Sequence, residues 1–592
     1  MDAYTGQILV ADLSKGETKP IITKREISAD FLGGSGFASR FLYDHLDATV
    51  NPLSPENMLL FMTGPLAGTL APCTGRHVVC GKSPLTNLWG ESHVGGHFGA
   101  FLKFSGFDGI LIKGRSEKPM TLHIENGHSE LLPADDLWGM MTGPTQDVLK
   151  KALGRVQVAC IGPAGENLVR FASIVTNERV SARCGLGAVM GSKNLKAIAV
   201  GGTTKPSLQK PPEFQKLAQE TRKTLAEAMS MLTAQGTAMY VDIAMMFNDM
   251  PIKYFQEIEF EDSELINAKS MEEILIGRSA CYSCPIGCGR RVEVPEYNLN
   301  SIEGPEYQTI ASFGSNMMIS DLRKIALMNH LCNQYGMDTI SCGSTIAFTT
   351  HLCEIGKADY GFTWNNPDAV IQTIHAIGNR KGIGDMLAEG AVSVAKKHSA
   401  EDIVLHVRGM ELPNHDPRAF AGMGTIYTVA SRGASHMEGD MYSVDMGADV
   451  RILGIIGGDR LENEGKGVIA AKTQDFRAFF DSVIMCQFAI VPPQHIIELL
   501  NLAIGTSYQL DDILKIGARA VTMKRLFNLR CGLKTEDEKL PTALLVPHAD
   551  SVTDDFVPDT DMQLNEYYEY RKWDRKTGRP SNDALEELGL SG

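Results

Sequence analysis

The sequence lacks an excess of basic residues and a long apolar run. Lys and Arg number 56 against 71 Asp and Glu, which gives a formal net charge of −15 at pH 7. We therefore expect no nucleic-acid partner, because no basic excess exists to neutralise phosphates. No apolar run reaches the roughly 18 residues of a transmembrane helix. The start of the chain has neither a basic segment nor an apolar one, so we expect no secretory signal and a cytoplasmic location.

Glycine motifs for nucleotides are also missing. Neither a Walker A sequence nor a G-x-G-x-x-G sequence occurs, so a nucleotide is not favoured as the ligand. There is no low-complexity tract and no repeat at a solenoid period. The 592 residues are too many for one hydrophobic core, so we expect two to four domains.

The pattern along the chain predicts an α+β protein. Residues 1–208 contain short β-type runs bounded by Gly, Pro, Asn and Asp, and a Pro- and Lys-rich break follows near 201–214. Helical periodicity then dominates, with a softer boundary in the Pro- and Gly-rich stretch 411–424. We predict a β-rich domain at 1–208 and two mostly helical domains at 209–410 and 411–592. Helices are expected at 212–232, 321–336, 473–488 and 493–505.

Cysteine is scarce, with 12 residues, and only three of them cluster. Such a distribution indicates buried thiols and one metal site rather than a disulfide framework. The cluster is CYSCPIGC, in which Cys281, Cys284 and Cys288 have C-x2-C-x3-C spacing. Three thiolates at this spacing favour an iron–sulfur cluster, with structural zinc as the alternative. Either site needs a fourth ligand from a distant segment.

Two hexapeptides resemble each other and suggest where that ligand lies. NQYGMD (333–338) and DSVIMC (481–486) both begin with a short polar side chain and have Met in fifth place. The second ends in Cys486, and two such segments could approach a pseudo-symmetric ligand from opposite sides. Chance explains this similarity about as well.

The first domain contains two segments that combine Gly with basic residues, at 71–110 and 177–200. Glycines allow backbone N–H groups to approach anionic oxygens closely, and basic side chains add charge-assisted bonds. The alternative is a set of β-turns with solvated charges. The candidates for anion binding are Arg76, Lys82, Arg183 and Lys193.

Together these features resemble the tungsten-containing aldehyde ferredoxin oxidoreductase family, along nearly the whole chain. The shared segments are TGQILVADLSKG, FLGGSGFASRFLYD, GKSPLT, GLGAVMGSKNLKAIAV, the cysteine triplet, EGPEYQT, ELPNHDPRAF, SRGASHMEGD, DSVIMC and NLRCGLKTEDEKLP. In this family the hexapeptide has the form D-x-x-G-L-[CD]. Here Asn333 replaces its Asp, Ile484 replaces its Gly, and Met replaces both Leu residues.

The resemblance implies the cofactors and the residues that hold them. The family binds one tungsten, or molybdenum, through two pyranopterins, with a Mg²⁺ ion bridging the pterin phosphates and one [4Fe–4S] cluster beside one pterin. It implies Cys486 as the fourth cluster ligand. The other implied cofactor-binding residues are Arg76, His93, Gly95, Ala182, Arg183, Asn333, Asp338 and Asp481, with His93 and Ala182 or its neighbours serving the cation through their carbonyls.

The resemblance also implies an activity. Glu306 in GPEYQ and His436 in RGASH match the family's catalytic pair, in which a Glu acts as base towards water and a His polarises a carbonyl or shuttles a proton. Without the motif context these two residues would be interpreted as a capped-turn glutamate and a core histidine. The implied reaction is aldehyde oxidation to a carboxylic acid. Electrons would pass to ferredoxin or a dedicated iron–sulfur subunit, and homodimers occur in the family.

Two other functions remain open from the sequence. The tungsten subunit of class II aryl-CoA reductases, of the benzoyl-CoA type, resembles the chain and would use the same cofactors in the opposite electron direction. A binding or scaffold protein with a structural cluster is the alternative outside enzymes.

Overall fold

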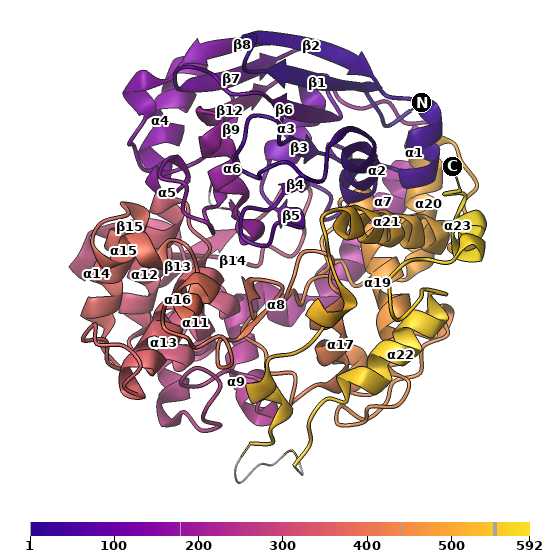
Figure 1. Cartoon of the computed structure of the whole chain (residues 1–592). Coiled ribbons are helices and arrows are strands. Elements are labelled where there is room, and N and C mark those ends of the chain that lie inside the picture. Colours follow the sequence, from indigo (N-terminus) through magenta and orange to yellow (C-terminus); the bar gives the residue numbers. More distant parts are fainter. Residues whose placement is uncertain (1, 178, 440, 549–552, 554, 592) are drawn as a thin grey trace.

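The structure is a computed structural model that describes residues 2–177, 179–439, 441–548, 553 and 555–591. Its first third forms two six-stranded sheets (Figure 1). In order across the sheet, the first contains β2 (Glu17–Ile22), β1 (Gln7–Asp12), β6 (Gly109–Lys113), β3 (Leu59–Met62), β4 (His77–Lys82) and β5 (Trp89–Val94). The second contains β11 (Arg179–Ser181), β10 (Ile174–Thr176), β9 (Gln157–Cys160), β12 (Leu195–Gly201), β7 (Met120–Glu125) and β8 (His128–Pro133).

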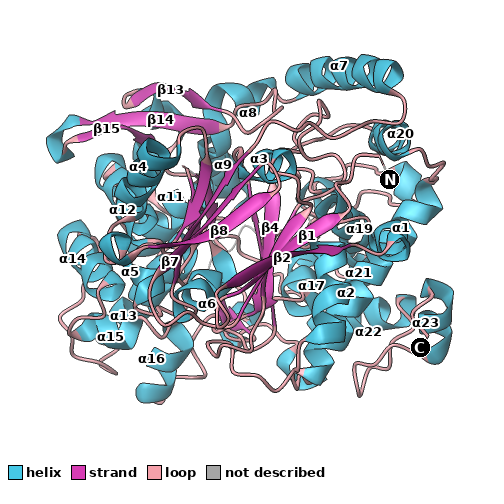
Figure 2. Ribbon diagram, turned by 90° about the horizontal axis from the view of Figure 1, so that it is seen from above, coloured by secondary structure: helices cyan, strands magenta, loops and turns pink. Residues whose placement is uncertain are grey.

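One hydrophobic core joins the two sheets. It contains Leu9 and Phe61 from the first sheet, Leu122 and Ile198 from the second, and Phe98 from a helix. The helices of this part are α1 (Arg25–Phe31), α2 (Gly34–His45), α3 (Phe98–Phe104), α4 (Thr142–Leu153), α5 (Pro163–Glu166) and α6 (Leu186–Ser192). Figure 2, seen from above, shows the strands of these two sheets grouped centrally with helices around them.

The rest of the chain is mostly helical, as the sequence predicts. The middle part contains α7 (Pro211–Ala228), α8 (Ser230–Gln235), α9 (Tyr240–Phe247), α10 (Ala268–Glu272), α11 (Tyr307–Phe313), α12 (Leu322–Tyr335), α13 (Thr339–Glu354), α14 (Pro367–Gly378), α15 (Ile383–Leu387) and α16 (Ala391–Lys397). It also has a small sheet of β13 (Leu275–Ser279), β14 (Gly289–Val294) and β15 (Leu299–Glu303), and a pair of β16 (His406–Val407) and β17 (Met410–Glu411).

The last part contains α17 (Ala421–Val429), α18 (Tyr442–Asp445), α19 (Lys466–Val483), α20 (Pro493–Ile504), α21 (Leu510–Arg530), α22 (Thr560–Tyr570) and α23 (Asn582–Leu588). In Figure 1 these helices lie at the right, and the middle helices α11–α16 lie at the lower left beneath the second sheet. The predicted α+β class is confirmed, while the domain boundaries at 208 and 410 stay predictions. No helix in the described ranges is long and apolar enough to cross a membrane.

Helix ends follow the predicted signals with two exceptions. The helix expected at 212–232 is divided, because α7 stops at Ala228 and α8 begins at Ser230. Helix α7 begins at Pro211, and α12 ends at Tyr335 with Gly336 as its left-handed cap. The helix expected at 473–488 is wrong at its C-terminal end, because α19 stops at Val483. Ile484 has φ 61° and ψ 49°, a left-handed conformation that cannot continue the helix.

Candidate functional site

The two hexapeptides have the same backbone design. In each, a helix ends at the third residue and the fourth is left-handed: Gly336 after α12 (φ 73°, ψ 61°) and Ile484 after α19 (φ 61°, ψ 49°). The sixth residues of the two hexapeptides make different interactions. Asp338 caps α13, its carboxylate accepting from the backbone N–H of Ile340 at 3.1 Å. Cys486 donates its backbone N–H to the carbonyl of Cys73 at 3.0 Å.

Glycines of the first domain let the second hexapeptide approach it closely. A Cβ added to Gly34 would overlap the carbonyl oxygen of Asp481, and one added to Gly64 would overlap the carbonyl oxygen of Val483. Gly34 also has φ 47°, which disfavours any side chain. The GGSG part of FLGGSGF therefore serves close packing against the end of α19.

The cysteine triplet lies in the loop between β13 and β14. Its backbone is tied to the first domain by the N–H of Tyr282, which donates to the Gly96 carbonyl at 2.9 Å. A Cβ on Gly95 would lie 2.7 Å from the Cys281 sulfur, so this position requires glycine. Cys284, Cys288 and Cys486 pack together against the core formed largely by α7, α19 and α20.

Cys486 interacts with the triplet cysteines electrostatically as well as through packing. Burial raises the pKa of the Cys486 thiol, Arg76 opposes the rise, and the sulfurs of Cys281 and Cys284 add to it. Arg76 Nη1 lies 3.8 Å from the Cys486 sulfur. The structure thus gathers the four predicted cluster cysteines into one site.

The spacing of these sulfurs separates the two metal hypotheses. Zinc–thiolate bonds of about 2.3 Å in a tetrahedron hold sulfurs about 3.8 Å apart. Within the described residues, no three cysteine sulfurs lie within 4.8 Å of one another. The structure therefore does not show the compact sulfur group of a closed zinc site, and four thiolates are also the number that a [4Fe–4S] cluster binds.

A fifth cysteine lies beside the triplet, which sequence reasoning missed. The Cys73 sulfur is 3.6 Å from that of Cys284. This hydrogen bond lowers the pKa of the Cys284 thiol to about 6, with burial opposing and the Ile286 and Gly287 N–H groups contributing. Cys73 is a buried thiol, as expected for cysteines outside the triplet, but it also contacts one of the predicted ligands.

Two adjoining cavities lie between the hexapeptides. Their shared wall consists of Arg76, His93, Val180, Ala182, Arg183 and Ile340. The first cavity extends to Gly95, Asn333, Asp338 and Glu306. The second extends to Asp481 and His436. All predicted cofactor-binding and catalytic residues except Cys486 therefore line these cavities, and Cys486 contacts the wall residue Arg76.

Two basic residues that were candidates for anion binding do not line these cavities. Lys82 donates through Nζ to the Val50 carbonyl at 2.9 Å. Lys193 donates to the Asn57 carbonyl at 2.5 Å, and burial lowers its pKa to about 8. Both lysines hold loop carbonyls inside the first domain, so that prediction is wrong for them.

Arginines supply the positive charge of the cavities. Arg183 donates to the carbonyls of Ala434 and Glu411 at 3.1 and 2.7 Å and pairs with Asp338 at 3.3 Å. Arg432 also lines the second cavity, and it donates to the Glu91 carbonyl at 2.8 Å. Arg432 belongs to the segment SRGASHMEGD and Glu91 to the segment 71–110, but neither was singled out as a site residue from the sequence.

His93 lies in a buried polar network. Its Nε2 is 2.6 Å from Glu91 and 3.5 Å from Asp481, and the ligand atoms of these three residues lie within 4.8 Å of one another. Glu91 already accepts from Lys524 at 2.6 Å and from Trp89 Nε1 at 2.7 Å. Lys524 and Arg432 both face the carboxylates of Glu91 and Asp481, so two positive side chains balance the two acidic ones without an added cation.

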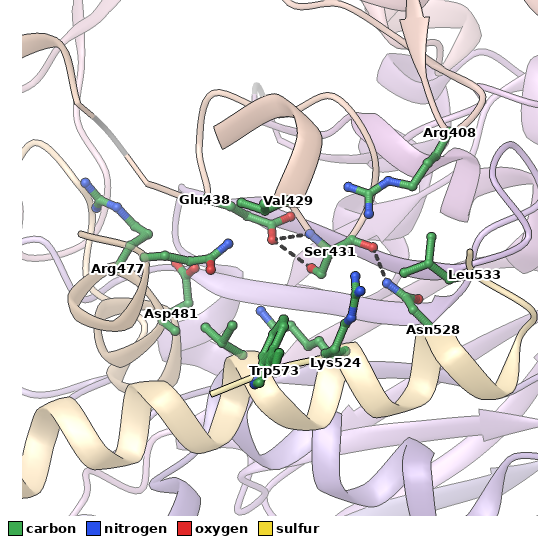
Figure 3. A pocket seen from close by; sticks show the side chains of 14 residues that line it. Arg408, Val429, Ser431, Glu438, Arg477, Asp481, Lys524, Asn528, Leu533 and Trp573 are labelled. Carbon is green, nitrogen blue, oxygen red and sulfur yellow. Dashed lines mark hydrogen bonds between the residues drawn. The ribbon is translucent and has the colours of Figure 1, made fainter. Parts of the chain in front are cut away.

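A small charged chamber adjoins Asp481 (Figure 3). Its volume of about 20 Å³ suffices for about one water molecule rather than a cofactor. Glu438 accepts from the N–H and hydroxyl of Ser431, both at 2.7 Å, and Asn528 donates to the Ser431 carbonyl at 2.6 Å. The lining cations are Arg408, Arg477, Lys524 and Arg525. The chamber supports the wall of the second cavity.

Glu306 is bound as a carboxylate beside the first cavity. It precedes α11, yet its side chain does not cap that helix. Instead it accepts from Arg179 Nη1 at 3.0 Å and from the Thr237 hydroxyl at 2.5 Å. Arg179 also pairs with Glu303 at 3.2 Å, and burial raises the pKa of Glu303 to about 7. The side chain of Glu306 remains 37% exposed, so water can reach it.

His436 is buried, and its Nδ1 has no hydrogen-bond partner in the described part of the chain. Burial lowers its pKa well below the ordinary value, and His415, Arg183 and Arg432 lower it further. The ring is 5.4 Å from that of His415, whose Nδ1 lies 2.5 Å from Asp249. Sequence reasoning missed this His415–Asp249 pair, because 166 residues separate the two.

The sequence comparisons decide the family. Residues 214–590 match the family profile "Aldehyde ferredoxin oxidoreductase, domains 2 & 3", and residues 8–202 match the profile of its N-terminal domain. The chain belongs to the aldehyde ferredoxin oxidoreductase family. The predicted family is thus confirmed, and so is the prediction that the protein is an oxidoreductase.

Individual relatives agree with this assignment. The tungsten-containing aldehyde ferredoxin oxidoreductase of Pyrococcus abyssi is 37% identical over 100% of this chain and 99% of its own length. A protein of Pyrococcus furiosus named aliphatic sulfonate oxidoreductase, WOR-like subunit, is 29% identical over 100% of this chain and 97% of its own. A solved structure of the active-site complex BamBC of benzoyl-coenzyme A reductase aligns with TM-score 0.86 and 25% identity, covering 100% of this chain and 97% of the other.

The site fits the cofactors of this family by its own chemistry. Arg76, Arg183 and Arg432 suit an anionic group, and they converge on cavities that hold few free acidic charges. Gln308 Nε2 and His436 Nδ1 are buried without a hydrogen-bond partner among the described residues. Burying such an atom costs free energy unless a ligand or a water molecule forms a hydrogen bond with it. The cavities therefore suit a phosphate-bearing, hydrogen-bonding cofactor.

Proposed function

We propose that this enzyme oxidises aldehydes to carboxylic acids, with water as the oxygen donor. The observation that carries the proposal is the placement of Glu306 and His436 on two adjoining cavities bounded by the hexapeptides. The balanced reaction converts one aldehyde and one water into one acid, two protons and two electrons. The 37% identity with the Pyrococcus abyssi enzyme supports this activity.

We propose that the cofactors are a bis-pyranopterin tungsten centre, or its molybdenum equivalent, and one [4Fe–4S] cluster. When bound, the metal centre supplies two-electron redox chemistry, and the cluster carries electrons away one at a time. Cys281, Cys284, Cys288 and Cys486 would hold the cluster. Arg76, Arg183, Asn333, Asp338 and Asp481 would hold the pterins, with Gly95 allowing close approach. The carbonyls of His93 and Ala182 would hold a bridging Mg²⁺ ion.

Glu306 is suited to act as the base. Arg179 and Thr237 hold its carboxylate as an acceptor, and its exposure allows a water molecule to bind it. It would take a proton from that water as the oxygen attacks the aldehyde carbon. Arg179 donates to this carboxylate and orients it, and Glu303 shares the same arginine.

His436 is suited to bind the aldehyde oxygen. Its lowered pKa keeps the ring neutral at physiological pH, so one ring nitrogen can donate a hydrogen bond and the other can accept one. The ring stands beside His415, which Asp249 holds in place. A neutral imidazole in a buried site orients and polarises the carbonyl without adding a charge.

Electrons would leave through the cluster to ferredoxin or a dedicated iron–sulfur subunit. Arg76 would lie between the pterin cofactor and the cluster, since it lines both cavities and contacts the Cys486 sulfur. From the family we also propose that the protein assembles as a homodimer. The electron-accepting protein is likewise proposed from the family.

A second candidate is the tungsten subunit of a class II aryl-CoA reductase. The TM-score of 0.86 to the benzoyl-coenzyme A reductase complex favours it. The aldehyde proposal is favoured by the higher identity to aldehyde oxidoreductases and by the Glu306–His436 pair. A scaffold protein with a structural cluster is disfavoured by the polar, arginine-lined cavities.

Metal analysis of anaerobically purified protein tests the proposal. We expect about one tungsten or molybdenum and four irons per chain, with viologen reduction upon addition of an aldehyde. Zinc without tungsten, molybdenum or iron would refute the enzyme proposal and support a structural metal site.

A further inference from the structure

Cys73 occupies the centre of the cysteine site without belonging to the predicted ligand set. Its backbone N–H donates to the Ser283 carbonyl at 3.2 Å, and its carbonyl accepts from the Cys486 N–H at 3.0 Å. Cys73 therefore bridges the triplet loop and the fourth ligand, two segments far apart in the sequence. Its own backbone is left-handed, with φ 61°.

This backbone position directs the thiol at one ligand. The Cys73 sulfur lies 3.6 Å from the Cys284 sulfur, a distance suited to an S–H···S hydrogen bond. Cys73 is 2% exposed, so water does not compete for this bond. The backbone N–H groups of Ile286 and Gly287 also donate to the Cys284 sulfur, which makes Cys73 its side-chain donor.

A donor fits the geometry better than a fifth ligand does. Two thiolates 3.6 Å apart in a buried site would repel each other strongly. A protonated thiol instead stabilises a neighbouring thiolate. The triplet and Cys486 already provide the four thiolates of a [4Fe–4S] cluster, so no iron remains for Cys73.

We propose that Cys73 is a positioning residue that tunes the cluster: its thiol donates a hydrogen bond to the Cys284 sulfur and raises the cluster's reduction potential. Reduction adds one electron, and therefore one negative charge, to the cluster and its thiolates. A donor to a ligand sulfur stabilises that additional charge more than it stabilises the oxidised form. The inference rests on the cluster named in the proposed function.

The test uses the full-length enzyme purified anaerobically, with Cys73→Ala and Cys73→Ser. Cys160→Ala is the matched control, because Cys160 is a buried thiol on β9 in the second sheet. Iron content and the EPR signal of the reduced protein are measured first. The midpoint potential is then obtained by EPR-monitored redox titration.

We expect all three variants to keep the wild-type iron content and cluster signal. Cys73→Ala should shift the potential to a lower value, Cys73→Ser should shift it less because the hydroxyl still donates, and Cys160→Ala should not shift it. The nearly isosteric Cys73→Ser serves as the test by itself should Cys73→Ala fail to fold. Its shorter side chain holds the hydroxyl farther from the Cys284 sulfur, so the hydrogen bond weakens and the potential falls by a smaller amount.

Three outcomes are distinguishable. Unchanged potentials in the Cys73 variants would overturn the tuning role. Loss of one iron, or conversion of the EPR signal, in these variants would also overturn it and make Cys73 a ligand. A wild-type protein without any iron–sulfur signal would instead refute the cluster itself, and with it the proposed function.

Discussion

Gly336 and Ile484 end their helices in the same left-handed conformation, at equivalent places in the two hexapeptides. For a β-branched residue this backbone costs about 1–2 kcal/mol. Ile484 is 1% exposed, and burial of its side chain stabilises the folded state by about 1.5–3 kcal/mol. Part of that packing is against Gly34, where an added Cβ would lie 2.6 Å from Ile484 Cδ1. The chain thus has the same left-handed turn in both hexapeptides, although at position 484 the residue would ordinarily avoid it.

Gly34→Ala should destabilise the junction between the first domain and α19. The new Cβ would overlap the Asp481 carbonyl oxygen and Ile484, and we expect a cost of about 1–3 kcal/mol beyond the left-handed strain. The matched control is Gly16→Ala, at φ 65° with no atom within 4 Å of the added Cβ. Thermal unfolding of both variants checks this. Equal midpoints for the two would contradict the packing role of Gly34.

Cys486→Ser should impair the cluster while leaving the chain folded. The sulfur is one of the four gathered thiols, whereas the backbone N–H to Cys73 survives the substitution. We expect a lower iron content and an altered EPR signal, with a far-UV circular dichroism spectrum like that of the wild type. Full iron and an unchanged cluster spectrum would remove Cys486 from the ligand set.

Glu306→Gln should lose most turnover and keep its metal. An amide cannot take a proton from water, and loss of general base catalysis typically costs about 10²–10⁴-fold in kcat. Glu389→Gln is a suitable control, because Glu389 is also paired with arginines and similarly exposed, at 33%. Steady-state aldehyde oxidation is measured alongside metal content. Wild-type turnover in Glu306→Gln would exclude Glu306 from the mechanism.

His436→Gln should retain more activity than His436→Phe. The pKa of His436 is lowered, so the neutral ring is the form present down to pH values well below 6.5, and a neutral amide can partly replace it. We expect a loss of about 10²–10⁴-fold for Phe and a smaller loss for Gln. Between pH 5.5 and 7 the wild-type profile of kcat/KM should show no ionisation of His436. The His436→Gln profile should therefore have the same shape in this range. If kcat/KM of the wild type instead fell as the pH rose through about 6.5, and this fall were absent in His436→Gln, the imidazolium would be the active form.

Local patterns in the sequence predicted part of this site. The triplet spacing predicted Cys281, Cys284 and Cys288 as ligands, because ligand spacing within one loop is a local property. Cys486 lies in a distant segment and was implied only by the family resemblance of its hexapeptide. The end of α19 was wrong, since Ile484 carries no helix-stop signal and only tertiary packing on Gly34 explains its backbone. The same combination of Gly and Lys that suggested anion binding proved, for Lys82 and Lys193, to bind loop carbonyls.

Contacts between distant segments could not be predicted. Cys73 and Cys284 are 211 residues apart, and Asp249 and His415 are 166 apart. Neither pair lies in a motif whose spacing encodes the contact. Arg179 and Thr237 reach Glu306 from two other elements, so the hydrogen bonds that orient its carboxylate follow from the fold alone.

The central claim is that the paired cavities oxidise aldehydes. The most direct test is viologen reduction by anaerobic, tungsten-loaded protein, with a panel of aldehydes compared with aryl-CoA thioesters and their cyclic dienoyl-CoA counterparts. We predict that aldehydes drive the reduction, that the acid is released in a one-to-two ratio to electrons, and that the CoA compounds give no turnover. Interconversion of an aryl-CoA and a dienoyl-CoA, with no reaction of any aldehyde, would contradict the account.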